Sequence, residues 1–128
     1  MSNQPYAGAL EAVDRILNRE READEVLRQS IAVLHDRIER YAWVGILFLD
    51  EGELTLGPWR GTLEEGAAEL EVPIAYDGRP IGALRVATDD PTGFGDDDRA
   101  FLDRVALLVS AHCLVGWDTG GVPWPEVG

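Results

Sequence analysis

An oppositely charged pair, Glu69 and Arg85, is the most promising polar feature of the sequence. Both residues lie in segments predicted to be neighbouring strands, and the expected register places their side chains opposite each other. A guanidinium in that position can bind the carboxylate or phosphate of a small ligand through paired hydrogen bonds. The plainer interpretation is a partly exposed structural ion pair worth less than about 1 kcal/mol.

Three aromatic residues, Trp43, Trp59 and Tyr76, lie in or beside the predicted strands and could form the walls of a ligand pocket. Aromatic side chains in strands more often pack in the core or against a cross-strand neighbour. The core interpretation is preferred for Trp43, and both interpretations stay open for Trp59. The predicted ligand-binding set is therefore Trp43, Trp59, Glu69, Tyr76 and Arg85.

The single cysteine, Cys113, excludes an intrachain disulfide framework and a thiolate zinc cluster. No cation nearby in the sequence would lower its pKa, so an inert buried thiol is expected. His35 and His112 lie on separate predicted helices, and adjacent helical residues such as His112 and Cys113 diverge by about 100°. The sequence therefore predicts no metal site and no cofactor.

Two acidic strings match known functional motifs, of aspartic proteases and of calcium-binding loops, only in part. Asp118-Thr119-Gly120 spells the triplet of aspartic proteases, yet it lies in a Gly- and Pro-rich tail and not in a loop between apolar strands. The run of Asp96, Asp97 and Asp98 lacks calcium-loop spacing and is interpreted as the acidic first turn of a helix. No catalytic residue is predicted.

Composition limits the function classes. The chain has 128 residues, enough for one domain, with a net charge of −13, 45% apolar and 27% charged residues. Such an acidic surface argues against nucleic acid and anionic membranes as partners. The N-terminus lacks the pattern of a signal peptide, and the longest apolar run, residues 42–49, is too short to span a bilayer. A soluble cytoplasmic protein is expected.

Apolar periodicity predicts two N-terminal helices and one C-terminal helix. The final helix is expected to begin after Phe94-Gly95 with Asp96 as its cap, and to end at Gly116. The apolar stripes are Tyr6, Leu10, Val13 and Leu17 in the first helix, Leu27, Ile31, Leu34 and Ile38 in the second, and Phe101, Val105, Leu108 and His112 in the third.

Four strands are predicted between these helices. Residues 42–49 are continuously apolar, which indicates a central strand covered on both faces. Residues 50–52 form a hairpin turn into a strand over 53–57, which Pro58-Trp59-Arg60-Gly61 is expected to stop. Strands over 69–75 and 80–88 follow. The order of helices and strands is that of an α+β domain with an antiparallel sheet.

The register of the last hairpin decides which side chains share a face. A two-residue Asp77-Gly78 loop would mix polar and apolar residues on both faces. A three-residue loop, with Gly78 in the left-handed conformation, places Leu70 opposite Leu84 and Glu69 opposite Arg85. The second register is self-consistent. It predicts one apolar face of Leu70, Val72, Ile74, Leu84 and Val86, and one polar face of Glu69, Glu71, Ala83 and Arg85.

Several strings of this sequence resemble a GAF domain, over about residues 6–115. They are Tyr41-Ala-Trp-Val-Gly, Leu54-Thr-Leu-Gly-Pro-Trp-Arg-Gly, Glu71-Val-Pro-Ile-Ala-Tyr-Asp-Gly-Arg-Pro-Ile-Gly-Ala-Leu and Phe94-Gly-Asp-Asp-Asp-Arg-Ala-Phe-Leu. The strings are most similar to the subfamily of free methionine-(R)-sulfoxide reductases. The resemblance implies a GAF-like sheet of about four strands in the order 2-1-4-3, with all three helices on one face and ligands on the other.

The sequence departs from that enzyme subfamily where its chemistry resides. The family has a long, cysteine-bearing segment between two strings that are joined here only by residues 62–70. Glu69 aligns with a family glutamate, whereas two substrate-binding aspartates correspond to Arg85 and Ala87. Sulfoxide reduction requires a thiolate and a resolving thiol. The resemblance therefore implies a truncated relative that lacks the family cysteines.

We expect a single domain over residues 1–128, with a core of about 6–116 and a tail of 117–128. Its expected function is that of a non-catalytic, cut-down GAF-like sensor of a small-molecule effector, or of a regulatory or dimerisation module. The alternatives are a sulfoxide reductase, which is disfavoured, and a pure protein-interaction module without a pocket. Because the truncation would uncover one sheet face, we expect a homodimer, a partner protein, or the tail residues Trp117, Pro123, Trp124 and Pro125 to cover it.

Overall fold

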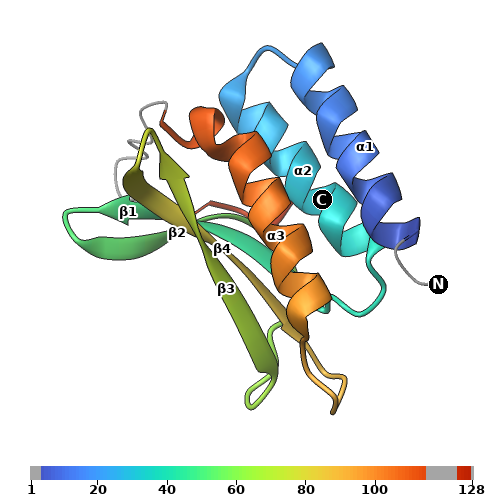
Figure 1. Cartoon of the computed structure of the whole chain (residues 1–128). Coiled ribbons are helices and arrows are strands. Elements are labelled where there is room, and N and C mark those ends of the chain that lie inside the picture. The colour runs from blue at the N-terminus through green and yellow to red at the C-terminus, as the bar shows by residue number, and fades with distance from the viewer. Residues whose placement is uncertain (1–3, 115–123, 128) are drawn as a thin grey trace.

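The computed structural model describes residues 4–114 and 124–127 (Figure 1). The order of elements is the predicted one of two helices, four strands and a helix. The elements are α1 (Gln4–Arg19), α2 (Ala23–Arg37), β1 (Trp43–Asp50), β2 (Glu53–Gly61), β3 (Ala68–Tyr76), β4 (Arg79–Thr88), α3 (Asp96–Val109) and the short 3-10 helix η1 (Ser110–Leu114).

The four strands form one antiparallel sheet in the order β2-β1-β4-β3, and all three helices lie on the same side of it (Figure 1). This confirms the predicted α+β fold. Helices α2 and α3 pack directly on the sheet, whereas α1 packs on α2 and α3 as an outer layer. No helix of the described residues is long and apolar enough to cross a membrane.

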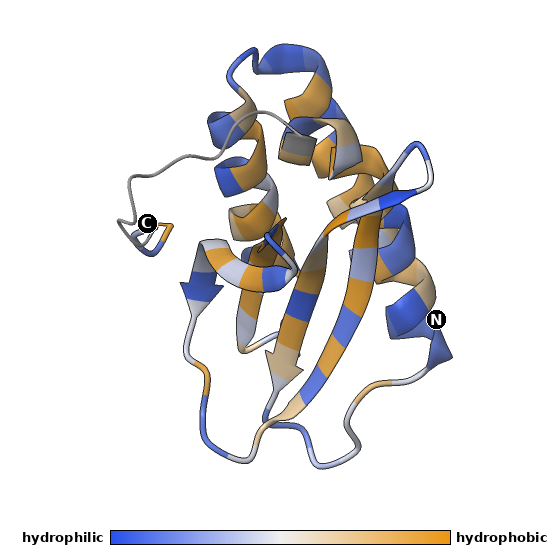
Figure 2. Ribbon diagram, turned by 90° about the vertical axis from the view of Figure 1, so that its left-hand side faces the viewer, coloured by the Kyte–Doolittle hydropathy of each residue, from blue (hydrophilic) through white to orange (hydrophobic). Residues whose placement is uncertain are grey.

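The core lies between the helices and one face of the sheet. The buried side chains of α2 and α3 meet every second residue of the strands, and Figure 2 shows hydrophobic and hydrophilic bands along the strands. Strand β1 is central and its residues 43–48 are buried, as predicted. The core strand residues are Val44, Ile46, Phe48, Val72, Ile74, Leu84 and Val86.

The ends of α3 differ from the prediction. Asp96 is the first helical residue and not the cap, which is Gly95. The carboxylate that accepts the Gly95 N–H belongs to Asp98, at 2.9 Å. The α-helix ends at Val109, where the Ser110 hydroxyl donates to a carbonyl of the preceding turn at 2.9 Å and a 3-10 helix follows. The predicted end at Gly116 lies outside the described residues.

Strand β2 does not stop at Pro58, as the sequence had suggested, but continues to Gly61. Its pairing with β1 shifts between Gly45 and Leu47, so that two residues of β2, Gly57 and Pro58, face Ile46. Proline is tolerated in a sheet at such a bulge on an edge strand, because no ladder hydrogen bond needs its missing N–H there.

The β3–β4 hairpin also has a register other than the predicted one. Its loop is the two-residue Asp77-Gly78, with φ of 53° and 78°. A bulge at Ile81 then shifts the pairing, so that Leu70 lies opposite Val86 and Glu71 opposite Arg85. The loop and the bulge together displace the predicted register by two residues. The predicted division of residues between the two faces is therefore correct, although their cross-strand partners are not.

Candidate functional site

The predicted ligand-binding residues lie mainly on the sheet face turned away from the helices, which we call the open face. Residues directly opposite each other in the ladders point to the same side, and neighbours of the core residues along each strand point to the other. The open face therefore carries Trp43, Gly45, Leu47 and Leu49 of β1, Leu54, Leu56 and Trp59 of β2, Glu69, Glu71 and Pro73 of β3, and Ala83, Arg85 and Ala87 of β4.

The far edge of the Trp43 ring lies against Gly45 of its own strand. A Cβ placed on Gly45 would lie 2.4 Å from the Trp43 ring, so only glycine leaves room for the indole there. Trp43 as a whole residue is 5% exposed. Arg85 lies opposite Gly45 on β4. Trp43 is thus a buried support beside the charged residues, in line with the core interpretation that was preferred for it.

Arg85 is held by two carboxylates. Its Nη2 and Nε atoms donate to Glu71 Oε1 at 2.6 and 2.9 Å, and Nε lies 3.8 Å from Glu69 Oε1. The prediction that Glu69 is the direct partner is wrong, because the shifted register makes Glu71 the residue opposite Arg85. One guanidinium and two carboxylates give this cluster a formal charge of −1. The net negative charge of the cluster therefore disfavours the binding of a phosphate while both carboxylates are in place.

Trp59 lies opposite Gly45 on the other side of β1, but its indole N–H donates to the Trp124 carbonyl at 3.1 Å. Its polar end is therefore directed to the C-terminal residues at the sheet edge. Tyr76 pairs with Arg79 beside the hairpin turn and is 42% exposed. Tyr76 follows Glu69 by seven positions in β3, which corresponds to about 23 Å along a strand. The structure brings Trp43, Trp59, Glu69 and Arg85 to one end of the open face, whereas Tyr76 lies at the opposite end of β3 and, by strand alternation, on the side of Val72 and Ile74.

The described part of the C-terminal tail does not lie over the open face. Trp124 packs its ring on Phe48, with 5.7 Å between centroids, and Phe48 points to the helix side. Residues 124–127 therefore occupy the edge of the sheet beside β2. Trp117, Pro123 and the triplet Asp118-Thr119-Gly120 lie outside the described residues.

Cys113 lies in the hydrophobic core between the helices and the sheet, with 4% of its surface exposed. Burial raises the pKa of its thiol to about 12, so the thiolate is not populated near neutral pH. The four-stranded sheet separates this sulfur from Arg85 and Glu71. Among residues 4–114 and 124–127, no three His, Cys, Asp or Glu side chains are grouped so as to hold a metal ion.

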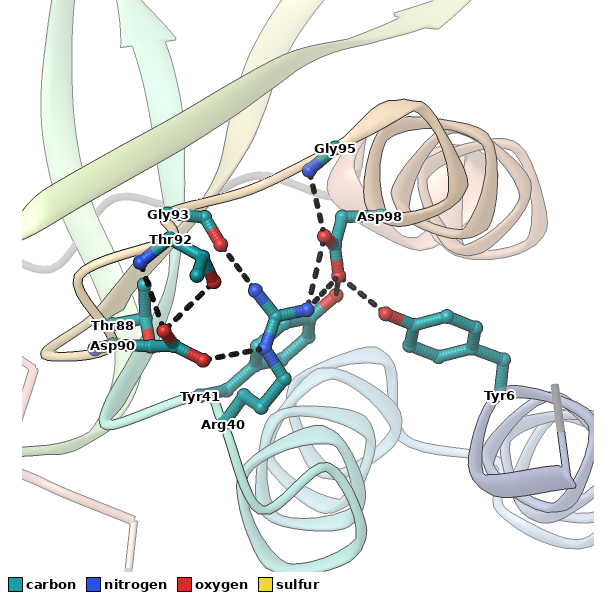
Figure 3. Close-up of polar contacts among 9 residues, drawn as sticks. All are labelled: Tyr6, Arg40, Tyr41, Thr88, Asp90, Thr92, Gly93, Gly95 and Asp98. Atoms are coloured by element: carbon teal, nitrogen blue, oxygen red, sulfur yellow. Dashed lines mark hydrogen bonds and ion pairs between the residues drawn. The ribbon is translucent and has the colours of Figure 1, made fainter. Parts of the chain in front are cut away.

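A buried polar cluster around Asp98 was missed from the sequence (Figure 3). Asp98 is 3% exposed and accepts hydrogen bonds from the Tyr6 hydroxyl, the Tyr41 hydroxyl at 3.3 Å, and Arg40 Nη1 at 3.2 Å from both oxygens. With the Gly95 N–H, these contacts use the acceptor capacity of the carboxylate. The one sequence signal was an acid three residues after the cap, as in a capping box.

The Asp98 cluster fastens separate elements together. Burial alone would raise the pKa of Asp98, but the bonds from Tyr6, Gly95 and Arg40 lower it below its usual value. The pKa of Tyr6 is raised to about 12 by burial and by the adjacent Asp98 carboxylate. Arg40 also donates to the Gly93 carbonyl and lies 3.5 Å from Asp90. A groove of about 740 Å³ adjoins the cluster, but Asp98 has no free oxygen for acid–base work. Its contacts join α3 to α1 and to the α2–β1 connection.

Comparison with known proteins identifies the architecture. No family model matches the chain, and no curated protein matches its sequence. A GAF domain from a phosphoenolpyruvate-protein phosphotransferase of Coxiella burnetii superposes with a TM-score of 0.77 over 95% of this chain and 100% of that domain, at 14% identity. Free methionine-R-sulfoxide reductase from Neisseria meningitidis gives 0.71 over 89% and 93%, at 20% identity. The chain has a GAF-like fold.

A second reductase, the type II free methionine-R-sulfoxide reductase from Thermoplasma acidophilum, is also similar. It superposes with a TM-score of 0.64 over 77% of this chain and 94% of that chain, at 19% identity. The fold is thus shared by reductases and by domains that are not described as enzymes. This GAF-like chain has one cysteine, Cys113, and joins β2 to β3 through residues 62–67 alone. Both features agree with a chain that lacks the cysteines expected of the reductases.

Proposed function

We propose that this chain is a non-catalytic regulatory domain that recognises a small ligand on its open face and does not reduce methionine sulfoxide. The observation that supports this best is the separation of the thiol from the charged cluster. Cys113 is buried on the helix side with a raised pKa, and Arg85, Glu69 and Glu71 lie on the other side of the sheet. A thiolate that attacks a bound sulfoxide must share the ligand site.

The charge of the open-face cluster limits the class of ligand. Glu71 and Glu69 exceed Arg85 by one negative charge, and all three side chains are partly exposed. An ammonium group can bind the two carboxylates, and a carboxylate on the same molecule can share the Arg85 guanidinium. We therefore expect a small zwitterion, such as an amino acid or its sulfoxide, in preference to a nucleotide.

A dimerisation module is the second candidate function, and the leucine patch of the open face favours it. Leu49, Leu54 and Leu56 are 37%, 40% and 38% exposed, and the β1–β2 ladder places them beside Leu47. Contiguous apolar side chains on a sheet face are commonly covered by another molecule. In this case the open face would bind a second copy of the chain. Sedimentation would then give the mass of a dimer for the wild type and the mass of a monomer for Leu54→Glu.

Thermal unfolding in the presence of ligands tests the first function. A ligand that binds only the folded state at 100 times its Kd stabilises it by about 2.7 kcal/mol. We expect amino acids or their sulfoxides to raise the melting temperature of the wild type and of Arg79→Met, a control on the same strand. Arg85→Met should lose the effect. Equal stabilisation of Arg85→Met, or stabilisation by nucleotides alone, would contradict the proposal.

A further inference from the structure

The C-terminal residues Trp124, Pro125, Glu126 and Val127 lie along the free edge of β2. Glu126 forms a parallel bridge with Trp59, and the Val127 N–H donates to the Trp59 carbonyl at 2.9 Å. The Trp59 indole N–H returns a bond to the Trp124 carbonyl at 3.1 Å. The segment thus pairs with the edge of the sheet through one isolated parallel bridge, the kind of backbone pairing that peptide recognition by strand addition uses.

Side chains of β1 and α2 hold the aromatic end of this segment. The Trp124 ring lies against the Phe48 ring, and the Arg28 guanidinium lies 5.1 Å from the Trp124 centroid. A cation that lies over the face of an indole ring is attracted to the ring electrostatically. A Cβ on Gly57 would lie 2.3 Å from the Phe48 ring, so this glycine leaves the room in which Phe48 lies beneath the tryptophan. Trp124 is therefore the anchor of the segment, and we call the surface that holds residues 124–127 the seat.

The acidic end is held by polar groups at the end of β2. Glu126 accepts the Gly61 N–H at 2.9 Å, and Arg60 Nη1 donates to the Val127 carbonyl at 2.6 Å. The seat thus combines an apolar contact with two arginines, Arg28 and Arg60, in a chain of net charge −13. Pro125 lacks an N–H and needs no acceptor. The contacts of the segment define a pattern of aromatic, proline, acidic and aliphatic residues.

The segment is not enclosed by the rest of the chain. A groove of about 430 Å³ lies between it and α2, and is lined by residues of both, including Arg28 and Glu126. Pro125 and Glu126 are exposed. Trp124 and Val127 are half-buried against the core, so release of the segment requires only these two side chains to leave their contacts with it.

We propose that the edge of β2, with Phe48, Arg28 and Arg60, is a binding site for an extended peptide of a partner protein, and that residues 124–127 occupy it in competition. The partner segment carries the same pattern, an aromatic anchor followed two residues later by an acidic residue and then an aliphatic one. A tethered segment acts at an effective concentration on the order of millimolar. A peptide that binds weakly therefore does not displace residues 124–127, whereas a partner that binds more tightly does. In a variant whose own segment is weakened, the site is free for weaker peptides as well.

Fluorescence anisotropy of a labelled peptide with the sequence of residues 121–128 tests the proposal on the full chain. We expect weak binding to the wild type and at least about tenfold tighter binding to Trp124→Ala, whose own segment has lost its anchor. Glu126→Arg is a second opening variant at an exposed position, where Arg60 repels the new charge. A peptide with alanine in place of its tryptophan should bind none of these proteins.

Two further variants decide between outcomes. Adding Arg60→Met to Trp124→Ala should abolish peptide binding, whereas adding Arg79→Met should not. Circular dichroism establishes that each variant is folded. Equal, weak binding of the peptide to the wild type and to both folded opening variants would overturn the proposal. A wild-type dimer that Trp124→Ala dissociates would assign the seat to the segment of a second copy, and would also overturn it.

Discussion

Replacing Asp98 with asparagine removes the charge at the centre of the cluster that joins α1, the α2–β1 connection and α3. Removing one partner of a buried ion pair costs about 3–5 kcal/mol. Arg40 is 37% exposed on its side chain, so the lower end applies. The amide of asparagine also places an N–H₂ donor where the carboxylate accepted hydrogen bonds from donors such as the Tyr6 hydroxyl, so some of these bonds are lost. We expect a loss of about 3 kcal/mol at pH 7, equivalent to a fall of about 10 °C in the melting temperature of a domain of this size.

The pH dependence of this loss has a definite sign. The folded pKa of Asp98 lies below its usual value of 3.8, so the ionised carboxylate stabilises the folded state above that pH. The contribution disappears as the pH falls through the lower folded pKa. The difference in free energy of unfolding between wild type and Asp98→Asn is therefore expected to be constant near neutrality and to shrink below about pH 4.

Calorimetry or circular dichroism melts at several pH values provide the measurement. Asp97→Asn is the matched control, because Asp97 is exposed in the same helical turn. Replacing Asp97 should lower the free energy of unfolding by less than about 1 kcal/mol. A melting temperature of Asp98→Asn within about 2 °C of the wild type at pH 7, which is well under 1 kcal/mol, would refute the reasoning. A gap that stays constant into acid would refute the assigned pKa direction.

Three more predictions concern the sheet and the thiol. Gly82→Ala should lose about 1–3 kcal/mol in urea unfolding, because its Cβ would lie 2.3 Å from the Leu47 carbonyl of the central strand; an unchanged midpoint would contradict the close approach. Arg85→Met and Glu71→Gln should each shift the free energy of unfolding by less than about 1 kcal/mol, since the pair is partly exposed; a larger loss would mark the cluster as structural. Cys113 should resist a thiol reagent in the folded protein and react in denaturant, because burial raises its pKa to about 12; fast native reaction would refute its burial.

The helices and strands could be predicted because burial selects residue types at regular intervals. The apolar run over β1 and the alternation over β3 and β4 identified the core face correctly. The bulges at Pro58 and Ile81 could not be predicted, because a bulge adds a residue to the backbone without a distinct side-chain pattern. For that reason Arg85 received the wrong partner, although the predicted faces were correct.

The candidate site was predicted less completely than the fold. Trp43, Glu69 and Arg85 share a face because strand alternation is regular, whereas Tyr76 was grouped with them by residue type alone. Asp98 was hidden in a run of three aspartates, since burial of one member depends on where Tyr6 and Arg40 arrive from distant parts of the chain. The seat of Trp124 on Phe48 likewise depends on contacts between opposite ends of the sequence.

Turnover of free methionine-(R)-sulfoxide, with a dithiol as reductant, tests the central claim most directly. The account predicts that the purified wild type and Cys113→Ser give the same rate as buffer with reductant alone, because the sole thiol is protonated and lies across the sheet from the charged cluster. Reduction by the wild type that Cys113→Ser abolishes would show that the sulfur reaches a bound sulfoxide, and would contradict the assignment of this domain as non-catalytic.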